Sequence, residues 1–272
     1  MRLATWNVNS LVARLPYVLE WADANKPDVL CMQETKLADD AFPEGAFAEL
    51  GYDAAHFGDG RWNGVGIVSR VGLDQPVCGL GSEEDLHGCR LVAATCAGIR
   101  VHSVYVPNGR SLDSEHYRNK LEWLDHLRAY LASHCDPSDP VAVCGDFNVA
   151  PDDTDVWDPA AFVGSTHVSE PERRALGEIL DWGLEDVFRR FHPEGGVFSW
   201  WDYRAGNFHK GMGMRIDLVL LSKVLSSRAV TAQVDRNARK KSAAGNKPSD
   251  HAVVVVDLDW DEQAPGPGEP RS

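Results

Sequence analysis

The sequence has no long hydrophobic run and no apolar segment at its start. Residues 1–10 lack the hydrophobic stretch of a signal peptide, and no run approaches the roughly 18 apolar residues of a membrane-spanning helix. The longest such runs, for example residues 253–256, have the length of a β-strand. These absences predict a cytoplasmic protein without a membrane partner.

Motifs of several common enzyme classes are also missing. The chain contains no phosphate-binding P-loop, no GxSxG motif, and neither a CxxC pair nor zinc-ligand spacing. Several cysteines lie within apolar strand patterns, where cysteine usually acts as a small buried hydrophobic residue. We therefore expect reduced thiols in a reducing compartment. The six cysteines are Cys31, Cys78, Cys89, Cys96, Cys135 and Cys144.

The composition is that of an ordinary globular protein. Of the 272 residues, 43% are hydrophobic and 25% charged, and the net charge is -14 at pH 7. This charge argues against a protein that coats nucleic acid, but it allows an enzyme with a local basic face, because association depends on the field at the site. We expect one domain over residues 1–260 and a disordered Pro/Gly-rich tail over residues 261–272.

Hydrophobic periodicity predicts an α/β protein. Helical spacing of apolar residues indicates helices over residues 15–22, 113–133 and 171–182. Pro16 suits an early turn of the first helix, and Ser111 or Asp113 suits the N-cap of the second. Two packed sheets with helices outside fit this order. Strands are expected over residues 2–8, 29–32, 52–57, 64–70, 73–79, 88–96, 99–106, 141–146, 198–203, 214–221, 228–235 and 252–258.

Residues 141–151, VAVCGDFNVAP, place an acid and an amide at the end of a buried strand. Asp146 and Asn148 stand two positions apart, a spacing that directs both side chains to one side of a strand. Gly145 allows the backbone to bend or to approach a ligand closely. Such a pair can hold a water molecule and a metal beside a phosphate. The structural alternative is an Asx turn that caps the strand.

Other strands also end in polar side chains, where sheet proteins often collect active-site residues. Single residues have structural alternatives: Glu34 can form an exposed ion pair, and Asp217 can pair with Arg215. His251 alone can be a structural histidine. The combination of acids, amides, a histidine and a tyrosine is harder to explain in this way. The full set is Asn7, Glu34, Tyr105, Asp146, Asn148, Asp217, Asp250 and His251.

These residue types suit phosphodiester hydrolysis. Carboxylate and amide oxygens are hard ligands for Mg²⁺ or Mn²⁺. An Asp–His combination supplies an oriented imidazole that can donate to phosphate or transfer a proton. A carboxylate such as Asp146 can activate water when its surroundings tune its pKa.

In the motifs that contain these residues, the sequence resembles the exonuclease III branch of the endonuclease/exonuclease/phosphatase superfamily. This branch includes the class II apurinic/apyrimidinic (AP) endonucleases. The resemblance covers about residues 1–258. GDFN and SDH mark the superfamily, whereas SWWDYR, RID and KPSDH together mark the AP endonuclease branch. The matching motifs are TWNVNS at 5–10, QETK at 33–36, YVPNG at 105–109, GDFNVAPDDTDV at 145–156, SWWDYR at 199–204, GMRIDLVLLS at 213–222 and KPSDHA at 247–252.

The resemblance implies a four-layer α/β sandwich, two packed mixed β-sheets flanked by helices. It also implies a monomer that acts on double-stranded DNA with Mg²⁺, for which Mn²⁺ can substitute. Members of the branch nick DNA 5′ to an abasic site and leave a 3′-hydroxyl. They often also remove 3′ blocking groups or trim nucleotides from 3′ ends.

The same resemblance implies roles for the strand-end residues. Asp146 deprotonates or orients the attacking water, and Asn148 positions the water and the phosphate. His251, oriented by Asp217, stabilises charge on the phosphoryl oxygens, and Tyr105 contacts the phosphate or donates a proton. Glu34 is the principal metal ligand. Beside it lie Asn7 and Asp250, and any second metal position is lined by Asp146, Asn148 and His251.

DNA contacts are implied outside this core. Trp200 and Met214 line the pocket for the abasic sugar, although both also suit a buried strand. An abasic sugar has no base to unstack, so its extrusion into an apolar pocket is cheap. Asn108 and Arg110 lie in a loop that can touch the opposite strand. A basic segment binds backbone phosphates or is simply a solvated charge run; it contains Arg236, Arg239, Lys240, Lys241 and Lys247.

Two other functions remain as alternatives. A superfamily phosphatase or sphingomyelinase would use the same core on a lipid or inositol phosphate, but SWWDYR and KPSDH argue against it. A non-catalytic DNA-binding relative would have lost Glu34, Asp146 or His251, and all three are present. The chain departs from many relatives at Val253, where they carry proline, and at Met214, where some carry a larger aromatic residue that affects pocket selectivity.

Overall fold

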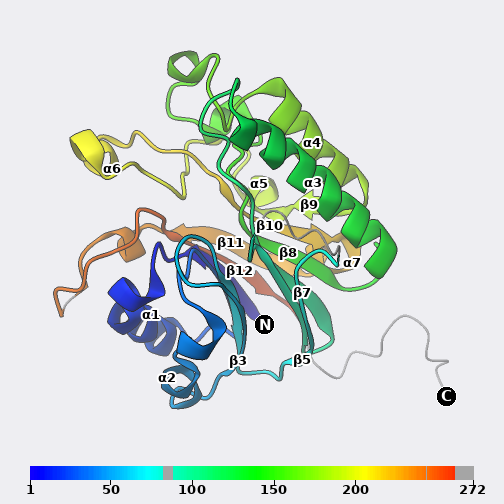
Figure 1. Cartoon of the computed structure of the whole chain (residues 1–272), viewed down its shortest axis with the longest axis vertical. Coiled ribbons are helices and arrows are strands. Elements are labelled where there is room, and N and C mark those ends of the chain that lie inside the picture. The colour runs from blue at the N-terminus through cyan, green and yellow to red at the C-terminus, as the bar shows by residue number, and fades with distance from the viewer. Residues whose placement is uncertain (82–87, 243, 261–272) are drawn as a thin grey trace.

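Two six-stranded mixed sheets form the centre of the molecule (Figure 1). The computed structural model describes residues 1–81, 88–242 and 244–260. In spatial order, the first sheet consists of β11 (Ala229–Asp235), β12 (Val253–Leu258), β1 (Arg2–Asn7), β2 (Val29–Gln33), β4 (Val65–Ser69) and β3 (Asp53–Phe57). The second consists of β5 (Asp74–Cys78), β6 (Leu91–Cys96), β7 (Ile99–Tyr105), β8 (Val141–Asp146), β10 (Asp217–Ser222) and β9 (Leu184–Asp186).

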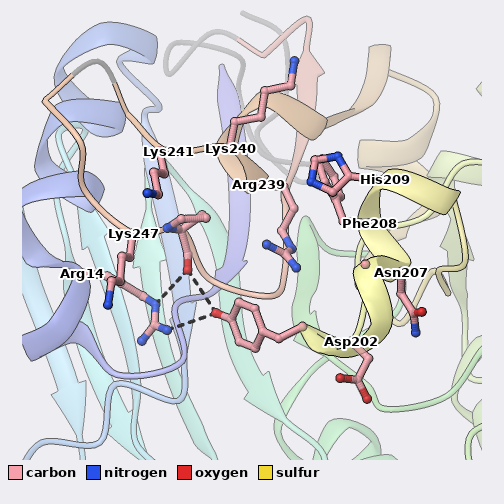
Figure 2. Close-up of a pocket in the computed structure, with 12 residues that line it drawn as sticks. Arg14, Asp202, Asn207, Phe208, His209, Arg239, Lys240, Lys241 and Lys247 are labelled. Carbon is pink, nitrogen blue, oxygen red and sulfur yellow. Dashed lines mark hydrogen bonds between the residues drawn. The ribbon is translucent and has the colours of Figure 1, made fainter.

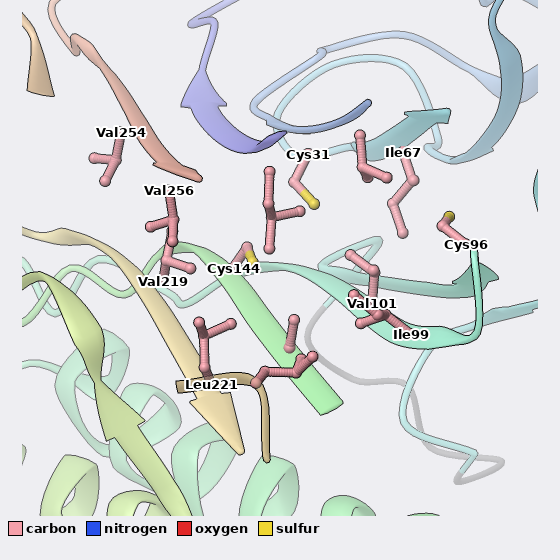
Figure 3. Close-up of a cluster of buried hydrophobic side chains, with 14 of the residues drawn as sticks. Cys31, Ile67, Cys96, Ile99, Val101, Cys144, Val219, Leu221, Val254 and Val256 are labelled. Carbon is pink, nitrogen blue, oxygen red and sulfur yellow. The ribbon is translucent and has the colours of Figure 1, made fainter. Parts of the chain in front are cut away.

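Apolar side chains fill the space between the two sheets (Figure 3). Cys31 and Ile67 of the first sheet share one buried cluster with Cys144 and Val219 of the second. Successive side chains of a strand point to opposite faces, so Met32, the residue after Cys31, packs in a different cluster on the outer face. Both faces of the central strands are therefore buried, which explains why they read as continuous apolar runs.

Helices cover the outer faces of both sheets (Figure 1). Val18 and Met32 belong to the apolar cluster between the first sheet and its helices, and Leu124 and Val143 belong to the cluster on the second sheet. The order helix, sheet, sheet, helix confirms the predicted four-layer α/β sandwich. The covering helices are α1 (Leu11–Asn25) and α2 (Glu44–Ala48) on the first sheet, and α3 (Glu115–His134) and α4 (Glu170–Asp181) on the second.

Several short elements lie in the connections and were not expected from the sequence, because segments of three to five residues carry too little periodicity to be recognised. The short α-helices are α5 (Val187–Phe191), α6 (Asn207–Lys210) and α7 (Lys223–Ser226). The 3₁₀ helices are η1 (Asp39–Ala41), η2 (Asp153–Asp155), η3 (Pro159–Phe162), η4 (Arg204–Gly206) and η5 (Arg236–Arg239).

The aromatic strand expected over residues 198–203 is wrong. Trp200 makes only isolated bridges, to Met214 and to His251. The backbone here divides its hydrogen bonds between two separate loops, since Trp200 N–H donates to the carbonyl of Met214 and Trp201 N–H to that of Asp250. For the same reason β10 begins at residue 217 rather than at 214.

The expected helix starts also need correction. α1 begins at Leu11, before the first apolar residue of the expected helix, and Pro16 lies in its second turn, which agrees with the early turn expected for it. α3 takes its N-cap from Ser114, whose hydroxyl accepts from Tyr117 N–H at 3.1 Å. Ser111 and Asp113, the expected caps, instead hydrogen-bond to each other at 2.7 Å in the preceding turn.

None of the helices in the described part of the chain combines the length and hydropathy that crossing a bilayer requires. None of the six cysteines, all of which lie among the described residues, forms a disulfide bond. The tail expected over residues 261–272 lies outside the described residues.

Candidate active site

Six strands place polar residues at one edge of the paired sheets. β1 and β2 run parallel, as do β7 and β8, so each pair ends at the same edge. β12 and β10 run antiparallel to β1 and β8 and therefore begin there. Asp146, the last residue of β8, lies opposite Tyr105 on one side and Asp217 on the other. The topology thus gathers residues that are far apart in the sequence.

Glu34 is anchored through both of its carboxylate oxygens. It follows β2 with a left-handed φ of 52°, which is uncommon outside glycine. Its Oε1 accepts hydrogen bonds from Asn7 Nδ2 at 2.9 Å and from the Tyr105 hydroxyl at 3.0 Å. Its Oε2 pairs with Lys36 Nζ at 2.8 Å. The ion pair considered for Glu34 exists, but it lies within the site and leaves only 17% of the glutamate side chain exposed.

Asp146 is buried between the two sheets. Its Oδ2 accepts a hydrogen bond of 2.9 Å from the same Asn7 Nδ2 group, and its Oδ1 accepts one of 2.9 Å from Asn148 N–H. The second bond is the Asx turn considered as a structural alternative. Burial raises the pKa of Asp146 to about 7, although the charge of His251 opposes part of the rise. Such a carboxylate can accept a proton near neutral pH.

His251 is held by Asp217. Its Nδ1 lies 2.9 and 3.1 Å from the two Asp217 oxygens, while Nε2 lies 3.9 Å from Asp146 Oδ2. Burial alone lowers the pKa of the imidazole, but the charge and hydrogen bond of Asp217, helped by the charge of Asp146, raise it to about 10. Asp217 does not pair with Arg215, which binds Asp155 and Asp186 instead.

Asn148 lies beyond the end of β8 in a left-handed conformation with φ of 51°. Its side chain donates to the carbonyl of Val106 at 3.0 Å and accepts from Asn108 Nδ2 at 3.2 Å. The spacing of two predicts that strand alternation places Asn148 beside Asp146. In the structure a turn after β8 does so instead. The expected neighbourhood is present for a different geometric reason.

Asp250 points to another set of partners. Its Oδ1 accepts from Asn9 Nδ2 at 2.9 Å, and its Oδ2 accepts from Trp200 Nε1 at 3.1 Å. Asn7, the other residue expected beside the metal, accepts from Asn9 N–H through Oδ1 at 2.9 Å. Its NH₂ group, rather than its carbonyl oxygen, therefore faces the two carboxylates.

Glu34, Asp146 and His251 each bring one potential ligand atom to within 4.8 Å of the others. Two carboxylates suit a hard cation such as Mg²⁺, which usually keeps several water ligands. His251 fits less well, because a ligating imidazole must be unprotonated whereas Asp217 favours the protonated ring. The residues present thus fit a divalent cation held mainly by Glu34 and Asp146.

The residues expected to contact DNA differ in their exposure. Asn108 and Arg110 are exposed in the loop after β7. Met214 is 1% exposed and packs with Val156 and the half-buried Trp200. The apolar cluster of Val156, Met214 and Trp200 therefore borders the site through Trp200, whose indole N–H donates a hydrogen bond to Asp250.

Some residues of the site were not singled out from the sequence. Lys36 pairs with Glu34 and also donates to Asn9 Oδ1 at 2.7 Å. Lys36 is the last residue of the QETK motif that contains Glu34, so the motif could have indicated that it belongs to the site. A second group holds the main-chain carbonyl of Asn148; it consists of Lys120 and His167, with Glu172 paired to the lysine.

Comparisons with known proteins agree with this geometry. The model of the Endonuclease/Exonuclease/phosphatase family matches residues 4–251. Exodeoxyribonuclease III of Haemophilus influenzae is 32% identical over 274 residues, which cover 95% of this chain and all of that protein. The structure of an AP endonuclease from Archaeoglobus fulgidus is 40% identical, with a TM-score of 0.89 over 96% of this chain and 100% of the other.

A third relative was solved with DNA. The 3′ phosphatase from Neisseria, bound to a product DNA hairpin, is 37% identical, with a TM-score of 0.90 over 96% of this chain and 100% of the other. The family match and these relatives cover nearly the whole chain and agree with the motifs that the sequence carries. The chain therefore belongs to the endonuclease/exonuclease/phosphatase family, in the branch of hydrolases that comprises exonuclease III and the AP endonucleases.

Proposed function

We propose that the protein is a Mg²⁺-dependent DNA repair phosphodiesterase that nicks the strand 5′ to an abasic site and leaves a 3′-hydroxyl. It also removes nucleotides and blocking groups from 3′ ends. The observation that carries this proposal is the cluster in which Asn7 joins Glu34 to Asp146 beside the Asp217–His251 pair. We further propose that residues 1–260 act as one catalytic domain in the cytoplasm.

The relatives support phosphoester chemistry on DNA and differ in its outcome. The Archaeoglobus protein is an AP endonuclease, the Haemophilus protein is an exodeoxyribonuclease, and the Neisseria protein is a 3′ phosphatase bound to a DNA hairpin. All three reactions transfer a phosphoryl group to water. In each case water attacks the phosphorus and the 3′-oxygen leaves as a 3′-hydroxyl, so one site can perform all three reactions if it tolerates different groups on the other side of the phosphate. We therefore propose the combined activity for this chain.

Asp146 and Asn148 act on the attacking water. Asp146 accepts the proton of the water. Burial raises the pKa of its carboxyl group, whereas the charge of a cation held by Glu34 and Asp146 would lower it. Asn148 orients the water and the phosphate from the adjoining turn. The N–H of Asn148 donates to Asp146 Oδ1, whereas Oδ2 accepts from Asn7 Nδ2 and lies 3.9 Å from His251 Nε2, so we take Oδ2 as the oxygen that faces the site.

His251 and Tyr105 stabilise charge on the phosphoryl group. The Nδ1 side of His251 is bound to Asp217, which leaves Nε2–H to donate to a phosphoryl oxygen. Burial raises the pKa of Tyr105 well above its usual value, so its hydroxyl keeps its proton and serves as a donor. His251 stands in place before substrate binds, which lowers the reorganisation that the reaction requires, whereas the Tyr105 hydroxyl would exchange its hydrogen bond to Glu34 for one to the phosphoryl group.

Glu34 and Asp146 would hold the divalent cation, with Asn7 and Lys36 fixing the carboxylate positions. When bound, Mg²⁺ would offset the negative charge that develops on the phosphoryl oxygens. Asp250 would bind the cation through a bridging water molecule, because Asn9 and Trp200 already donate hydrogen bonds to its two carboxylate oxygens.

The apolar side of the site would take the abasic sugar. Trp200 borders this side with the buried Met214 packed against it, and Asn108 and Arg110 lie exposed where the opposite strand would pass. A sugar without a base enters such a pocket without unstacking, which would favour abasic sites over intact nucleotides.

The test is incision of an end-labelled duplex that carries one abasic-site analogue, with Mg²⁺ or with EDTA. We expect a single cut 5′ to the lesion that EDTA abolishes and that Asp146→Asn slows by roughly 10²- to 10⁴-fold. Asp40→Asn, which changes an exposed aspartate outside the cluster, is the matched control and should cut normally.

Two outcomes would contradict the proposal. Digestion of an intact duplex from its 3′ ends, with the lesion left uncut, would make the protein chiefly an exonuclease. Failure to cut either duplex, combined with hydrolysis of a phosphoester that is not a nucleic acid, would identify a phosphatase of the same family.

A further inference from the structure

The segment that carries Glu34 has a strained backbone. Glu34 and Lys36 both have left-handed φ values, of 52° and 54°, which are unfavourable outside glycine unless the surroundings enforce them. Thr35 lies between them and is fully buried. The position of the Glu34 carboxylate therefore depends on what fixes Thr35 and its two neighbours.

The loop between β1 and α1 holds one side of this segment. Ser10 N–H donates to the main-chain carbonyl of Glu34 at 2.7 Å. Arg14 steadies the loop, because its guanidinium group donates to the carbonyl of Asn9 and, at 3.3 Å, to that of Pro248 (Figure 2). Main-chain bonds thus fix this side, whereas the other side depends on the side chain of Thr35.

A histidine of β3 binds the Thr35 hydroxyl. Thr35 Oγ1 lies 2.8 Å from His56 Nε2, and His56 Nδ1 lies 2.8 Å from Asp39 Oδ1. Burial lowers the pKa of His56, although the hydrogen bond and charge of Asp39 oppose the shift, so the ring is neutral at pH 7. A carboxylate only accepts, so Nδ1 carries the proton and Nε2 accepts from the Thr35 hydroxyl. We call these three residues, Asp39, His56 and Thr35, the His56 anchor.

The surroundings lock the imidazole in this orientation. The ring of His56 stacks on that of Phe42, with centroids 4.5 Å apart and planes inclined by 24°. A Cβ atom at Gly58 would come within 2.5 Å of His56 Cε1, and one at Gly64 would lie 2.1 Å from Thr35 Oγ1. Both positions therefore require glycine if the ring and the hydroxyl are to meet. The anchor is a closely packed arrangement and not a loose surface contact.

A hydroxyl, an imidazole and a carboxylate in this order also suit a nucleophilic triad. Burial excludes that role here, because Thr35 has no exposed surface and the His56 side chain is only 4% exposed. A substrate cannot reach the hydroxyl. The anchor therefore acts on the chain beside it, and the nearest functional group along the chain is the carboxylate of Glu34.

We propose that the His56 anchor is a positioning device for the metal-binding carboxylate, and that it holds Glu34 in its left-handed conformation within reach of Asp146. The inference rests on the proposed function and deepens it, because it adds three residues on which the affinity for Mg²⁺ depends. The anchor acts through the backbone of Glu34, whereas the chemical step belongs to the residues at the strand ends.

The first test compares two substitutions of Thr35. Thr35→Val keeps the shape of the side chain and removes the hydroxyl, whereas Thr35→Ser keeps the hydroxyl. Tyr52→Phe is the control, because it removes another buried hydroxyl next to β3, one that donates to the carbonyl of Pro27 at 2.8 Å near the opposite end of β2. Binding of Mn²⁺ is measured without DNA from the electron paramagnetic resonance signal of the free ion, and stability from urea unfolding.

We expect the Kd of Thr35→Val for Mn²⁺ to rise at least about fivefold, the lower end of the effect of leaving one buried acceptor without its donor. Thr35→Ser and Tyr52→Phe should bind Mn²⁺ like wild type, although Tyr52→Phe should lose stability. At a Mg²⁺ concentration below saturation, kcat of Thr35→Val for incision should fall while KM for DNA stays unchanged.

Two substitutions of His56 separate its two hydrogen bonds. Glutamine places an amide oxygen near the position of Nε2, and asparagine places its amide near that of Nδ1. His56→Gln should therefore keep the bond to Thr35 and the affinity for Mn²⁺, whereas His56→Asn should bind Mn²⁺ as weakly as Thr35→Val does. The amides of Thr35 and Lys36, which donate to Gly64 and Asn63, should exchange hydrogen faster in His56→Asn but not in His56→Gln.

The outcomes separate this inference from the proposed function. If Thr35→Val loses only stability, as Tyr52→Phe does, or if His56→Asn binds Mn²⁺ like wild type, the anchor is merely structural and the inference is overturned. If wild type binds Mn²⁺ but does not cut DNA, the proposed function fails, while the variants still decide whether the anchor positions Glu34. If wild type binds no Mn²⁺, both fail.

Discussion

The ammonium group of Lys120 donates a hydrogen bond of 2.6 Å to the main-chain carbonyl of Asn148. Lys120 lies fully buried on α3 and forms an ion pair with Glu172 of α4. His167 Nδ1 lies 2.5 Å from the same carbonyl. A left-handed residue is strained unless its surroundings hold it, and this buried group supplies the constraint two residues from Asp146. The helical layer of the second sheet thus fixes part of the active site.

Replacing Lys120 with methionine should therefore affect both stability and activity. The change leaves the Glu172 carboxylate buried without its cation, which costs about 3–5 kcal/mol, and it removes one of the two groups that hold the carbonyl of Asn148. Urea unfolding measures the first effect and kcat the second. Lys120→Met/Glu172→Gln removes both charges and should recover part of the stability but not the activity. A single variant as stable as wild type would show that the pair is not energetically coupled.

Asp217→Asn should slow the chemical step without weakening DNA binding. Asparagine cannot favour the protonated imidazole, so the pKa of His251 should fall from about 10. We expect kcat to drop by roughly 10²- to 10⁴-fold with KM nearly unchanged, and the alkaline limb of the pH–rate profile to move to lower pH. Single-turnover incision at several pH values measures both. A profile of unchanged shape would mean that His251 does not act in its protonated form.

Glu34→Gln should impair the response to Mg²⁺. The substitution keeps the shape of the side chain but removes the charge that pairs with Lys36 and faces Asp146. We expect the Mg²⁺ concentration for half-maximal incision to rise at least about tenfold, because Mg²⁺ binds carboxylates far more readily than amides. Glu44→Gln, on the exposed start of α2, is the control. Identical Mg²⁺ titrations of both variants would remove Glu34 from the metal site.

His102 should make the fold sensitive to acid. Burial lowers the pKa of this β7 histidine from 6.5 to about 4, although its hydrogen bond to the Ala142 carbonyl opposes part of the shift. Between these pH values the unfolded chain binds a proton that the folded chain does not, so stability falls as the pH decreases through this window and levels off below it. The contribution is up to about 3 kcal/mol.

The measurement is urea unfolding from pH 7.5 to 4. Other groups titrate in the same range, so the comparison is between wild type and His102→Gln, which removes the ionisable ring. The difference in unfolding free energy between the two proteins should move in favour of the variant as the pH falls from 6.5 to 4. Parallel curves would show that His102 is charged to the same extent in both states.

Gly145→Ala should destabilise the protein. A Cβ atom there would lie 1.9 Å from the carbonyl oxygen of Val104, on the neighbouring strand β7. The close approach expected at this glycine is therefore to the sheet itself and not to a ligand. The strand must shift, which should cost at least about 2 kcal/mol and lower kcat through Asp146.

Gly177 on α4 provides the matched comparison, since a Cβ there would meet no atom within 4 Å. Gly177→Ala should stabilise the protein by about 0.5–1 kcal/mol, because alanine loses less entropy in a helix. Thermal unfolding of both variants shows the contrast. Equal effects at the two positions would mean that the β7–β8 contact relaxes without strain.

The sequence by itself predicted the layers of the fold and the polar residues that the structure gathers at one edge of the sheets. Short apolar segments predicted the strands, and polar residues at strand ends such as Asp146 and Tyr105 could be expected to meet, because active sites in sheet proteins collect there. The motif resemblance then supported the same set. The apolar pattern of residues 198–203 predicted a strand that the structure lacks, because the backbone there forms hydrogen bonds with two loops instead of a neighbouring strand.

Only the tertiary structure decided how these residues are oriented. Asp250 is adjacent to His251 in the sequence, yet its side chain binds Asn9 and Trp200. Lys120 and Glu172 are separated by 52 positions, and each alone reads as a solvated charge on a helix. Their pairing depends on the packing of α3 against α4. Sequence periodicity specifies which face of an element is buried, whereas the partner of a buried charge is set by elements that meet only in the folded chain.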